Sequence, residues 1–496
     1  MSAPHSIASF EGFQAPMDIH PINNRCPLNN PSSLLMFMPN ELIAEILSFL
    51  SVKTITQFKC VSKSWNSLIS DPTFVKMHFK KSSQNPRLIL PILEDPMKDD
   101  HCQVVSSPVH RILENLSITV AGDTYNSLKD DHCQVVSLPV HRILDNLSIA
   151  VAADTYHSLK DNHFQVVGSC NGLLCLLFNS LSATHSNYWF CLWNPATGTI
   201  SENLGFFRDS KPISSGPFFT FTFGCDYLSG IYKVVAFRQE GKEVKKNEGL
   251  WRNEVRVFSL GDSCWRNIQS FPMVPHICNE GVHFRGTVNW LDLCDDVGSI
   301  SVGDILKVYI PHVKLFVIVS LDLSPETYTQ FLLPKGFNEV PCVVPSVQVL
   351  MDCFCFSHDF KRTEFVIWKM NEFGVHESWS QLFRIEYVNL QMHDPPIYDN
   401  LDLLGFTRCD TPLFPLYLSK NGDKLILTSD EDARVVTIYD HRDKRVKRTR
   451  ISNEISLFNA IHYAESLVST PWKCEDVKEE EKEDEQEEEG YLFSED

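Results

Sequence analysis

The sequence predicts an α+β chain of more than one domain, with a small all-helical module near the N terminus followed by a large all-β domain. Two observations carry this prediction. Residues 34–80 hold apolar side chains at helical spacing. From residue 165 onward, short apolar runs alternate with Gly, Asn, Asp and Pro, and helical periodicity is nearly absent. A chain of 496 residues has room for a small module and one large or two medium domains.

The helical module carries more apolar surface than its short helices can bury among themselves. Leu42, Ile46 and Leu50 recur every four residues on a predicted helix that begins at Pro39. A unit of about 45 residues buries too little of its own surface to be comfortably stable alone. The surplus therefore indicates that a helix of this module binds in a groove of a second protein.

This segment resembles the F-box, the helical motif that docks proteins onto the Skp-type adaptor of cullin-based SCF ubiquitin ligases. The matching residues are Pro39, Glu41-Leu42, Glu45-Ile46-Leu47, Leu50, Phe58-Lys59-Cys60-Val61, Lys63-Ser64-Trp65 and Ser67-Leu68-Ile69. Met38 stands where the family usually has Leu, and Ser51 where many plant members have Pro. The resemblance implies an adaptor-binding set of eight residues, namely Met38, Pro39, Leu42, Ile46, Leu50, Phe58, Val61 and Trp65. A three-helix unit that packs on the rest of the chain, or a helix-turn-helix, is the alternative.

The β domain contains five recurring pairs of predicted strands, which start at residues 168, 220, 281, 349 and 415. Such spacing is typical of four-stranded blades arranged radially, so residues 87–470 are predicted to form a β-propeller-like domain. Residues 87–167 and the late segment ISLFNAIHYAESLVS are candidates for a sixth blade or for closing the ring. Asn171-Gly172 predicts a hairpin turn, since both positions tolerate positive φ. The recurring tryptophans are interpreted as packing between blades: Trp193, Trp265, Trp290, Trp368 and Trp379.

The same region resembles the F-box-associated domain of a very large, kelch-like plant family. The matching runs are Ser169–Cys175, Leu192–Gly198, Phe223-Gly224, Asp226-Tyr227, Tyr232–Val235, Gly286, Trp290-Leu291, Tyr463 and Glu465–Val468. With the F-box, the resemblance covers about residues 34–470. Gly198-Thr199 replaces the Arg-Lys pair of many members.

A tandem duplication interrupts the start of the β domain. Residues 99–129 recur as residues 130–160, and five positions differ between the copies. A solenoid would need at least three repeats and would seldom be so nearly identical. We therefore expect one structurally required copy and one spare that forms a surface excursion.

Charge and composition exclude several classes of protein. A net charge of −19 argues against a general nucleic-acid binder. Residues 473–496 hold thirteen Asp and Glu against three Lys, and they are predicted to be a disordered acidic tail. Residues 1–33 are also predicted to be disordered, and they lack a secretory signal. Because no apolar run approaches twenty residues, we expect no membrane partner and a cytoplasmic or nuclear location.

The sequence offers no enzymatic signature and no candidate catalytic, cofactor-binding or metal-binding residues. Sixteen cysteines lack paired C-x-x-C spacing, and the phosphate-loop, dinucleotide, G-x-S-x-G and H-E-x-x-H motifs are missing. The resemblance implies a non-catalytic substrate-recognition subunit of an SCF ubiquitin ligase, whose partners are the adaptor and, through it, cullin and RING subunits. Its protein target is unknown, and the candidate target-binding loops are residues 201–219, 238–253 and 292–312. A propeller enzyme, a carbohydrate-binding protein, or an F-box protein acting outside degradation are the alternatives.

Overall fold

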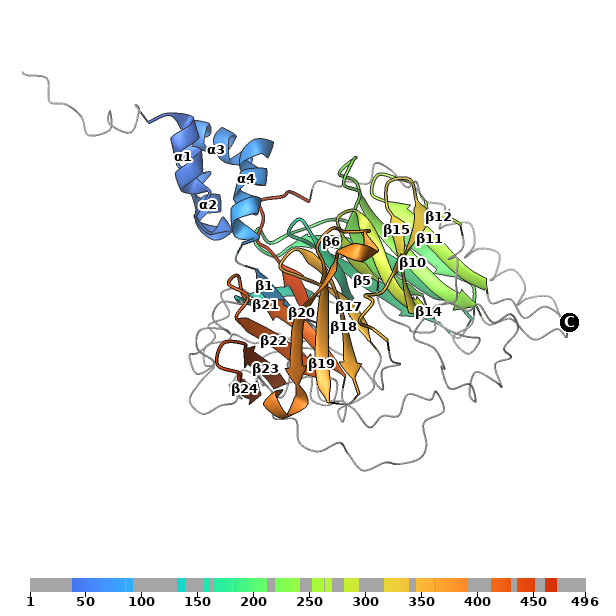
Figure 1. Cartoon of the computed structure of the whole chain (residues 1–496). Coiled ribbons are helices and arrows are strands. Elements are labelled where there is room, and N and C mark those ends of the chain that lie inside the picture. Colours follow the sequence, from blue (N-terminus) through green and yellow to red (C-terminus); the bar gives the residue numbers. More distant parts are fainter. Residues whose placement is uncertain are drawn as a thin grey trace, which may run out of the picture.

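The structure is a computed structural model, shown in Figure 1. It describes residues 38–84, 86–91, 132–139, 156–160, 164–182, 184–211, 219–240, 252–262, 264–269, 281–293, 316–338, 345–361, 363–390, 412–429, 435–450 and 460–470. The predicted disordered segments 1–33 and 473–496, and the first repeat copy at 99–129, lie outside the described residues.

The helical module consists of four short helices: α1 (Asn40–Leu47), α2 (Val52–Phe58), α3 (Lys63–Ser70) and α4 (Pro72–Ser82). Pro39 precedes α1, as the sequence predicts. A side-chain oxygen caps each of the other helices, because the first N–H groups of a helix have no partner within it. Ser51 Oγ accepts from the Thr54 amide at 3.3 Å, Ser62 Oγ from the Trp65 amide at 3.1 Å, and Asp71 Oδ1 from the Thr73 amide at 2.7 Å. The departure from Pro at Ser51 thus supplies a cap for α2.

The described strands form six antiparallel sheets, which we call blades 1 to 6. Blade 1 contains β25 (Ile461–Tyr463), β1 (Arg87–Pro91), β2 (His132–Pro139) and β3 (Tyr156–Lys160). Blade 2 contains β4 (Phe164–Cys170), β5 (Leu173–Leu181), β6 (Ser186–Asn194), β7 (Thr199–Ile200) and β8 (Leu204–Asp209), and blade 3 contains β9 (Thr220–Cys225), β10 (Tyr232–Glu240), β11 (Arg252–Ser259) and β12 (Arg266–Asn267).

Blades 4 to 6 complete the arrangement. Blade 4 contains β13 (Val282–Phe284), β14 (Thr287–Leu293), β15 (Phe316–Asp322) and β16 (Thr327–Leu332). Blade 5 contains β17 (Ser346–Leu350), β18 (Cys353–Phe360), β19 (Glu364–Met370) and β20 (Trp379–Glu386), with the 3-10 turns η5 (His376–Ser378) and η6 (Tyr387–Leu390). Blade 6 contains β21 (Leu413–Leu418), β22 (Lys424–Ser429), β23 (Val435–Asp440) and β24 (Arg445–Arg450).

The six blades close into a ring through one edge strand of each sheet. Contacts run from β25 to β4, β9, β13, β17 and β21 in turn. The circle closes where His462 of β25 donates from Nε2 to the Leu416 carbonyl of β21 and stacks on Tyr417, with ring centroids 6.1 Å apart. The prediction of a β-propeller is therefore confirmed.

Blade 1 joins the two ends of the β domain. Arg87 pairs with Tyr463 and Ile89 with Ile461 across an antiparallel ladder, so β25 completes a sheet that β1 begins. The two candidate segments thus form one sixth blade and close the ring with it. Its strands β2 and β3 both come from the second repeat copy, residues 130–160.

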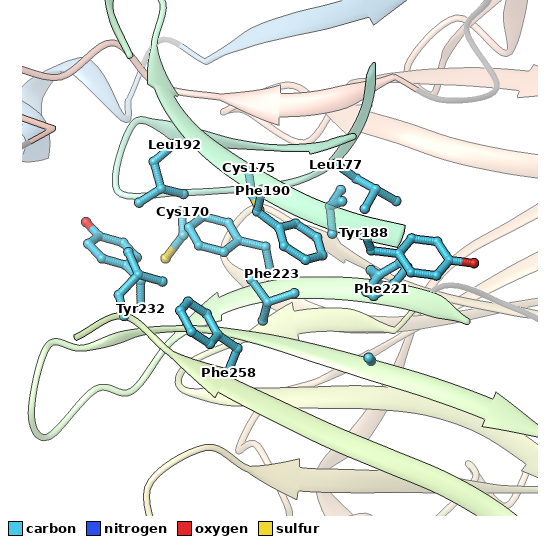
Figure 2. Packing of buried hydrophobic residues seen from close by; sticks show 14 of the residues in the cluster. Cys170, Cys175, Leu177, Tyr188, Phe190, Leu192, Phe221, Phe223, Tyr232 and Phe258 are labelled. Carbon is cyan, nitrogen blue, oxygen red and sulfur yellow. The ribbon is translucent and has the colours of Figure 1, made fainter. Parts of the chain in front are cut away.

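Aromatic side chains fill the space between blades 2 and 3 (Figure 2). Phe190 of β6 meets Phe221 of β9 with ring centroids 5.2 Å apart. The prediction that residues 201–219 form a loop was wrong at β8, where buried Phe207 stacks on Tyr188 with ring centroids 5.1 Å apart. The tryptophan prediction is confirmed, since all five pack in the hydrophobic clusters of the blades: Trp193, Trp265, Trp290, Trp368 and Trp379.

The Asn171-Gly172 turn also forms as predicted, with φ of 52° and 78°. Gly172 lies against the segment that follows β25, because a Cβ added to it would come within 2.4 Å of Ser466 Cβ. No helix in the described part of the chain is long and apolar enough to cross a membrane.

Candidate adaptor-binding site

Helix α1 has two apolar faces with different surroundings. Ala44 and Leu47 are buried, and they pack with Ile55, Ile69 and Phe74 in the core of the helical module. On the other face, Leu42 and Ile46 are 55% and 56% exposed. The apolar positions of α1 therefore divide between the core of the module and its surface.

Phe49 extends this exposed face, and sequence reasoning missed it. It is 67% exposed and follows Leu42 and Ile46 at the spacing i, i+4, i+7, which is the signal that would have found it. Lys81 at the end of α4 lies over the Phe49 ring, with Nζ 3.7 Å from the ring centroid, and forms an ion pair with Glu45 at 2.7 Å. We call Leu42, Ile46 and Phe49 the α1 ridge.

The other predicted adaptor-binding residues fall into two groups. Met38, Pro39 and Val61 are exposed. Leu50, Phe58 and Trp65 are partly buried and pack on the core of the module. The Phe58 and Trp65 rings meet edge to face, with centroids 5.4 Å apart and an interplanar angle of 83°. The second group therefore shapes the module from within, while the contact of all eight residues with an adaptor stays a prediction.

Polar contacts fix the geometry of the ridge. Buried His78 of α4 donates from Nε2 to the Leu50 carbonyl at 2.9 Å, which ties the end of α4 to the chain that follows α1. At the start of α4, hydrogen bonds from Thr73 hold the pKa of Asp71 below its ordinary value, so this cap is a carboxylate at neutral pH. The ridge thus projects from a module in which side chains cap the first turns of α2, α3 and α4.

The propeller completes the core of the helical module. Leu467, which follows β25, is 7% exposed and belongs to the same cluster as Leu47 and Ile55, while Ala196 packs against that cluster. Figure 1 shows the four helices at one end of the propeller, beside the chain that follows β25. The α1 ridge is therefore presented by a module that is anchored to the propeller.

The chemistry of this site is apolar recognition. Burying one Leu, Ile or Phe side chain in a partner's groove contributes roughly 1.5–3 kcal/mol. Burial raises the pKa of the Cys191 and Cys355 thiols to about 12, so both are neutral and unreactive. Among the described residues, no group of three or more His, Cys, Asp or Glu side chains is arranged to hold a metal ion.

The described part of the chain thus combines an anchored helical module, which carries an exposed apolar ridge, with a six-bladed propeller. Comparison with protein families agrees: residues 35–77 match the F-box domain, and residues 127–470 match the F-box associated beta propeller domain. The chain therefore belongs to the F-box proteins that carry an F-box associated propeller.

Plant proteins are among its relatives. The chain is 26% identical over 355 residues to an F-box/kelch-repeat protein of Arabidopsis thaliana, covering 70% of this chain and 79% of that protein. It is 25% identical over 378 residues to a second Arabidopsis F-box protein, covering 73% and 72%. A putative F-box protein of the same plant is 49% identical over 57 residues, which cover 12% of this chain and 18% of that protein.

Proposed function

We propose that this chain is the target receptor of an SCF-type ubiquitin ligase, acting in the cytoplasm or nucleus. The F-box domain implies a Skp-type adaptor as its partner. The observation that carries the proposal is the α1 ridge, because three large apolar side chains lie exposed on one face of α1 and the turn after it, while Ala44 and Leu47 on the other face are buried in the core of the module.

The chain itself contributes proximity. An adaptor bound to the ridge would bring cullin, RING and ubiquitin-carrying subunits to a target held by the propeller. Holding two reactants together converts a bimolecular transfer into an effectively intramolecular one. F-box and F-box associated domains are typical of non-catalytic receptor proteins, which fits this role.

The two ends of the blades suit different partners. Asn194 and Gly172 lie at the end where Leu467 meets the helical module, and we call this end the F-box face. Strands β8, β10 and β14 run away from it, so the connections at 212–218, 241–251 and 294–315 begin at the opposite face. These connections overlap the three predicted target-binding loops, and they would hold a target without displacing the adaptor.

Affinity capture from plant cells with the proteasome blocked tests this function. The tagged chain is compared with the double variant Leu42→Asp/Ile46→Asp and with Leu181→Asp/Leu332→Asp, which changes two propeller residues of similar exposure, 52% and 59%. We expect all three chains to capture the same target, and the ridge variant alone to lose the adaptor and leave the target without ubiquitin.

Two results would contradict the proposal. Equal recovery of adaptor and cullin with the ridge variant would remove the ridge from the adaptor contact. A target that is captured by the unaltered chain, yet carries no ubiquitin with the proteasome blocked, would favour an F-box protein that acts outside degradation.

A further inference from the structure

The outer edge of blade 6 is strongly basic in a chain that is acidic overall. Residues 441–450, HRDKRVKRTR, contain six Lys and Arg against one Asp, a net charge of +5, whereas the whole chain carries −19. They form β24 and the turn before it. The five basic side chains whose burial is described are all exposed: Arg442, Lys444, Arg445, Lys447 and Arg448. We call residues 441–450 the basic edge.

The fold leaves this edge available to an extended segment. Strand β24 pairs with β23 on one side, and among the described residues no strand pairs with its other side. Val446 faces the core between blades 5 and 6, where η6 packs beside it. Arg442 forms an ion pair with Asp423 at 2.6 Å. An edge strand offers backbone N–H and C=O groups to an added strand, and basic side chains favour an acidic one.

The chain contains a segment of matching charge. Residues 479–489, EEEKEDEQEEE, hold nine acidic residues against one Lys, a net charge of −8, and they precede Tyr491-Leu492-Phe493. Opposite charges of this size attract strongly at low ionic strength, and the attraction weakens as salt is added.

The acidic segment is long enough to reach the basic edge. It begins nine and ends nineteen residues after Thr470. An extended chain of these lengths reaches roughly 30 to 65 Å from Thr470. Blade 6 adjoins blade 1, where β25 contacts β21 through His462. Three strand spacings separate β21 from β24, about 15 Å. A tether of this length gives an effective concentration on the order of millimolar.

We propose that residues 479–493 bind along the basic edge of blade 6 in the same chain. The acidic side chains pair with the Lys and Arg side chains of residues 441–450, and the segment runs beside β24. The edge is thereby shielded from other chains, and an acidic segment of another protein must displace the tail before it can bind there.

A fluorescent peptide of residues 473–496 tests the proposal by fluorescence anisotropy against three chains: residues 1–472, residues 1–496, and residues 1–472 with Lys444→Gln/Arg445→Gln/Lys447→Gln. The control for the last chain is Lys53→Gln/Lys76→Gln/Lys335→Gln, which removes three exposed lysines far from β24 in sequence. We expect the peptide to bind residues 1–472 in 50 mM salt, at least tenfold more weakly to the basic-edge variant, and within twofold to the control.

The full chain identifies the occupant. If its own tail covers the edge, residues 1–496 bind the peptide at least tenfold more weakly than residues 1–472 and remain monomeric by light scattering. Equal affinity of residues 1–472 and residues 1–496 for the peptide would overturn the proposal. An equal loss of affinity in the basic-edge variant and in its control would overturn it as well. A tail-dependent dimer would assign the edge to the tail of a second copy and would also overturn it. None of these measurements involves the adaptor, so they are independent of the proposed ligase function.

Discussion

Asn194 of blade 2 and Ser466, 272 residues later in the chain, are joined by a buried hydrogen bond. Asn194 Nδ2 donates to the Ser466 carbonyl at 3.0 Å and to the Val468 carbonyl at 2.8 Å. The Ala196 amide donates to Asn194 Oδ1 at 3.0 Å and to the Tyr463 hydroxyl at 3.1 Å. Leu467 lies between the two carbonyls that Asn194 binds and enters the core of the helical module. One amide side chain thus fastens the segment that anchors the F-box.

Replacing this amide tests the anchor. Asn194→Ala leaves the Ser466 and Val468 carbonyls without the hydrogen bonds that Asn194 donates, and a buried group left unsatisfied costs about 1–3 kcal/mol. The Ala196 amide keeps its bond to the Tyr463 hydroxyl. We expect faster hydrogen exchange in residues 464–468 and in α1–α4, with blades 4 and 5 unchanged. Asn66→Ala, at an exposed position of α3, is the control. Unchanged exchange of the helices would show that the anchor does not depend on Asn194.

A charge at Leu467 should release the helical module itself. Leu467→Asp places a carboxylate in the cluster formed with Leu47 and Ile55, at a cost of several kcal/mol. Leu228→Asp, at a fully solvated turn, should cost nothing measurable. We expect α1–α4 to lose helical circular dichroism below the melting temperature of the propeller. A single unfolding transition at the temperature of the unaltered chain would contradict this role.

The two repeat copies should contribute unequally to the stability of the chain. Deleting residues 99–129 retains β2 and β3, whereas deleting residues 130–160 forces the first copy to supply them, with Ser107 where Leu138 pairs with Leu88. Because Leu88 is buried, replacing the Leu at its ladder position by Ser should cost up to about 1 kcal/mol.

We therefore expect both deletion variants to be soluble, and the one lacking residues 130–160 to melt a few degrees lower. Thermal melts of the three chains measure the difference. Aggregation of both variants would show that both copies are integrated into the fold, contrary to the expectation of a spare.

Acid should lower the free energy of unfolding of the propeller, because His358 is buried in its neutral form. Trp368 Nε1 donates to His358 Nε2 at 3.1 Å, and His358 Nδ1 donates to the Asp359 carbonyl at 2.8 Å. Burial lowers the pKa of His358 to about 4 from its ordinary 6.5. The unfolded chain therefore takes up the proton first, and the free energy of unfolding falls as the pH drops from about 6.5 to about 4, by roughly 3 kcal/mol.

Urea unfolding between pH 7 and pH 4 measures this contribution. His358→Gln keeps an acceptor for Trp368 and does not titrate, so its free energy of unfolding should depend less steeply on pH. Acidic residues contribute equally to both chains and cancel in the comparison. Parallel pH profiles for the two chains would show that His358 does not titrate in this range.

The helical module shows what the sequence could predict. The spacing of Leu42, Ile46 and Leu50 predicted an apolar helix after Pro39, and α1 begins there but ends at Leu47, so Leu50 lies beyond it. The spacing thus gave the start of the helix correctly and its end wrongly. It could not divide that surface between core and solvent, because the division depends on α4 and on Leu467, which arrives from the other end of the chain. Phe49 was missed although its spacing from Leu42 and Ile46 carried a signal, and the packing shows that its ring stays exposed.

Blade 1 shows a second limit of prediction from the sequence. Local patterns predicted the five later units, where each hairpin is formed by neighbouring residues. In blade 1, β1 pairs with β25 from the far end of the chain, so no local pattern contains the sheet. The nearly identical repeat copies carry the same local signal, so the sequence could not say that the second copy supplies β2 and β3. Strand β8 was missed because exposed and buried positions alternate over only four of its residues, Phe206 to Asp209, which is a weak strand signal in the sequence.

The most direct test of the account is the affinity of the purified chain for a purified Skp-type adaptor. Isothermal titration calorimetry compares the unaltered chain, Leu42→Asp/Ile46→Asp, and the control Leu181→Asp/Leu332→Asp. Two unpaired carboxylates in an apolar groove cost several kcal/mol, so we expect the ridge variant to bind at least 100-fold more weakly and the control within twofold, with all melting temperatures unchanged. Binding of the ridge variant within twofold of the unaltered chain would contradict the assignment of the α1 ridge as the adaptor-binding site.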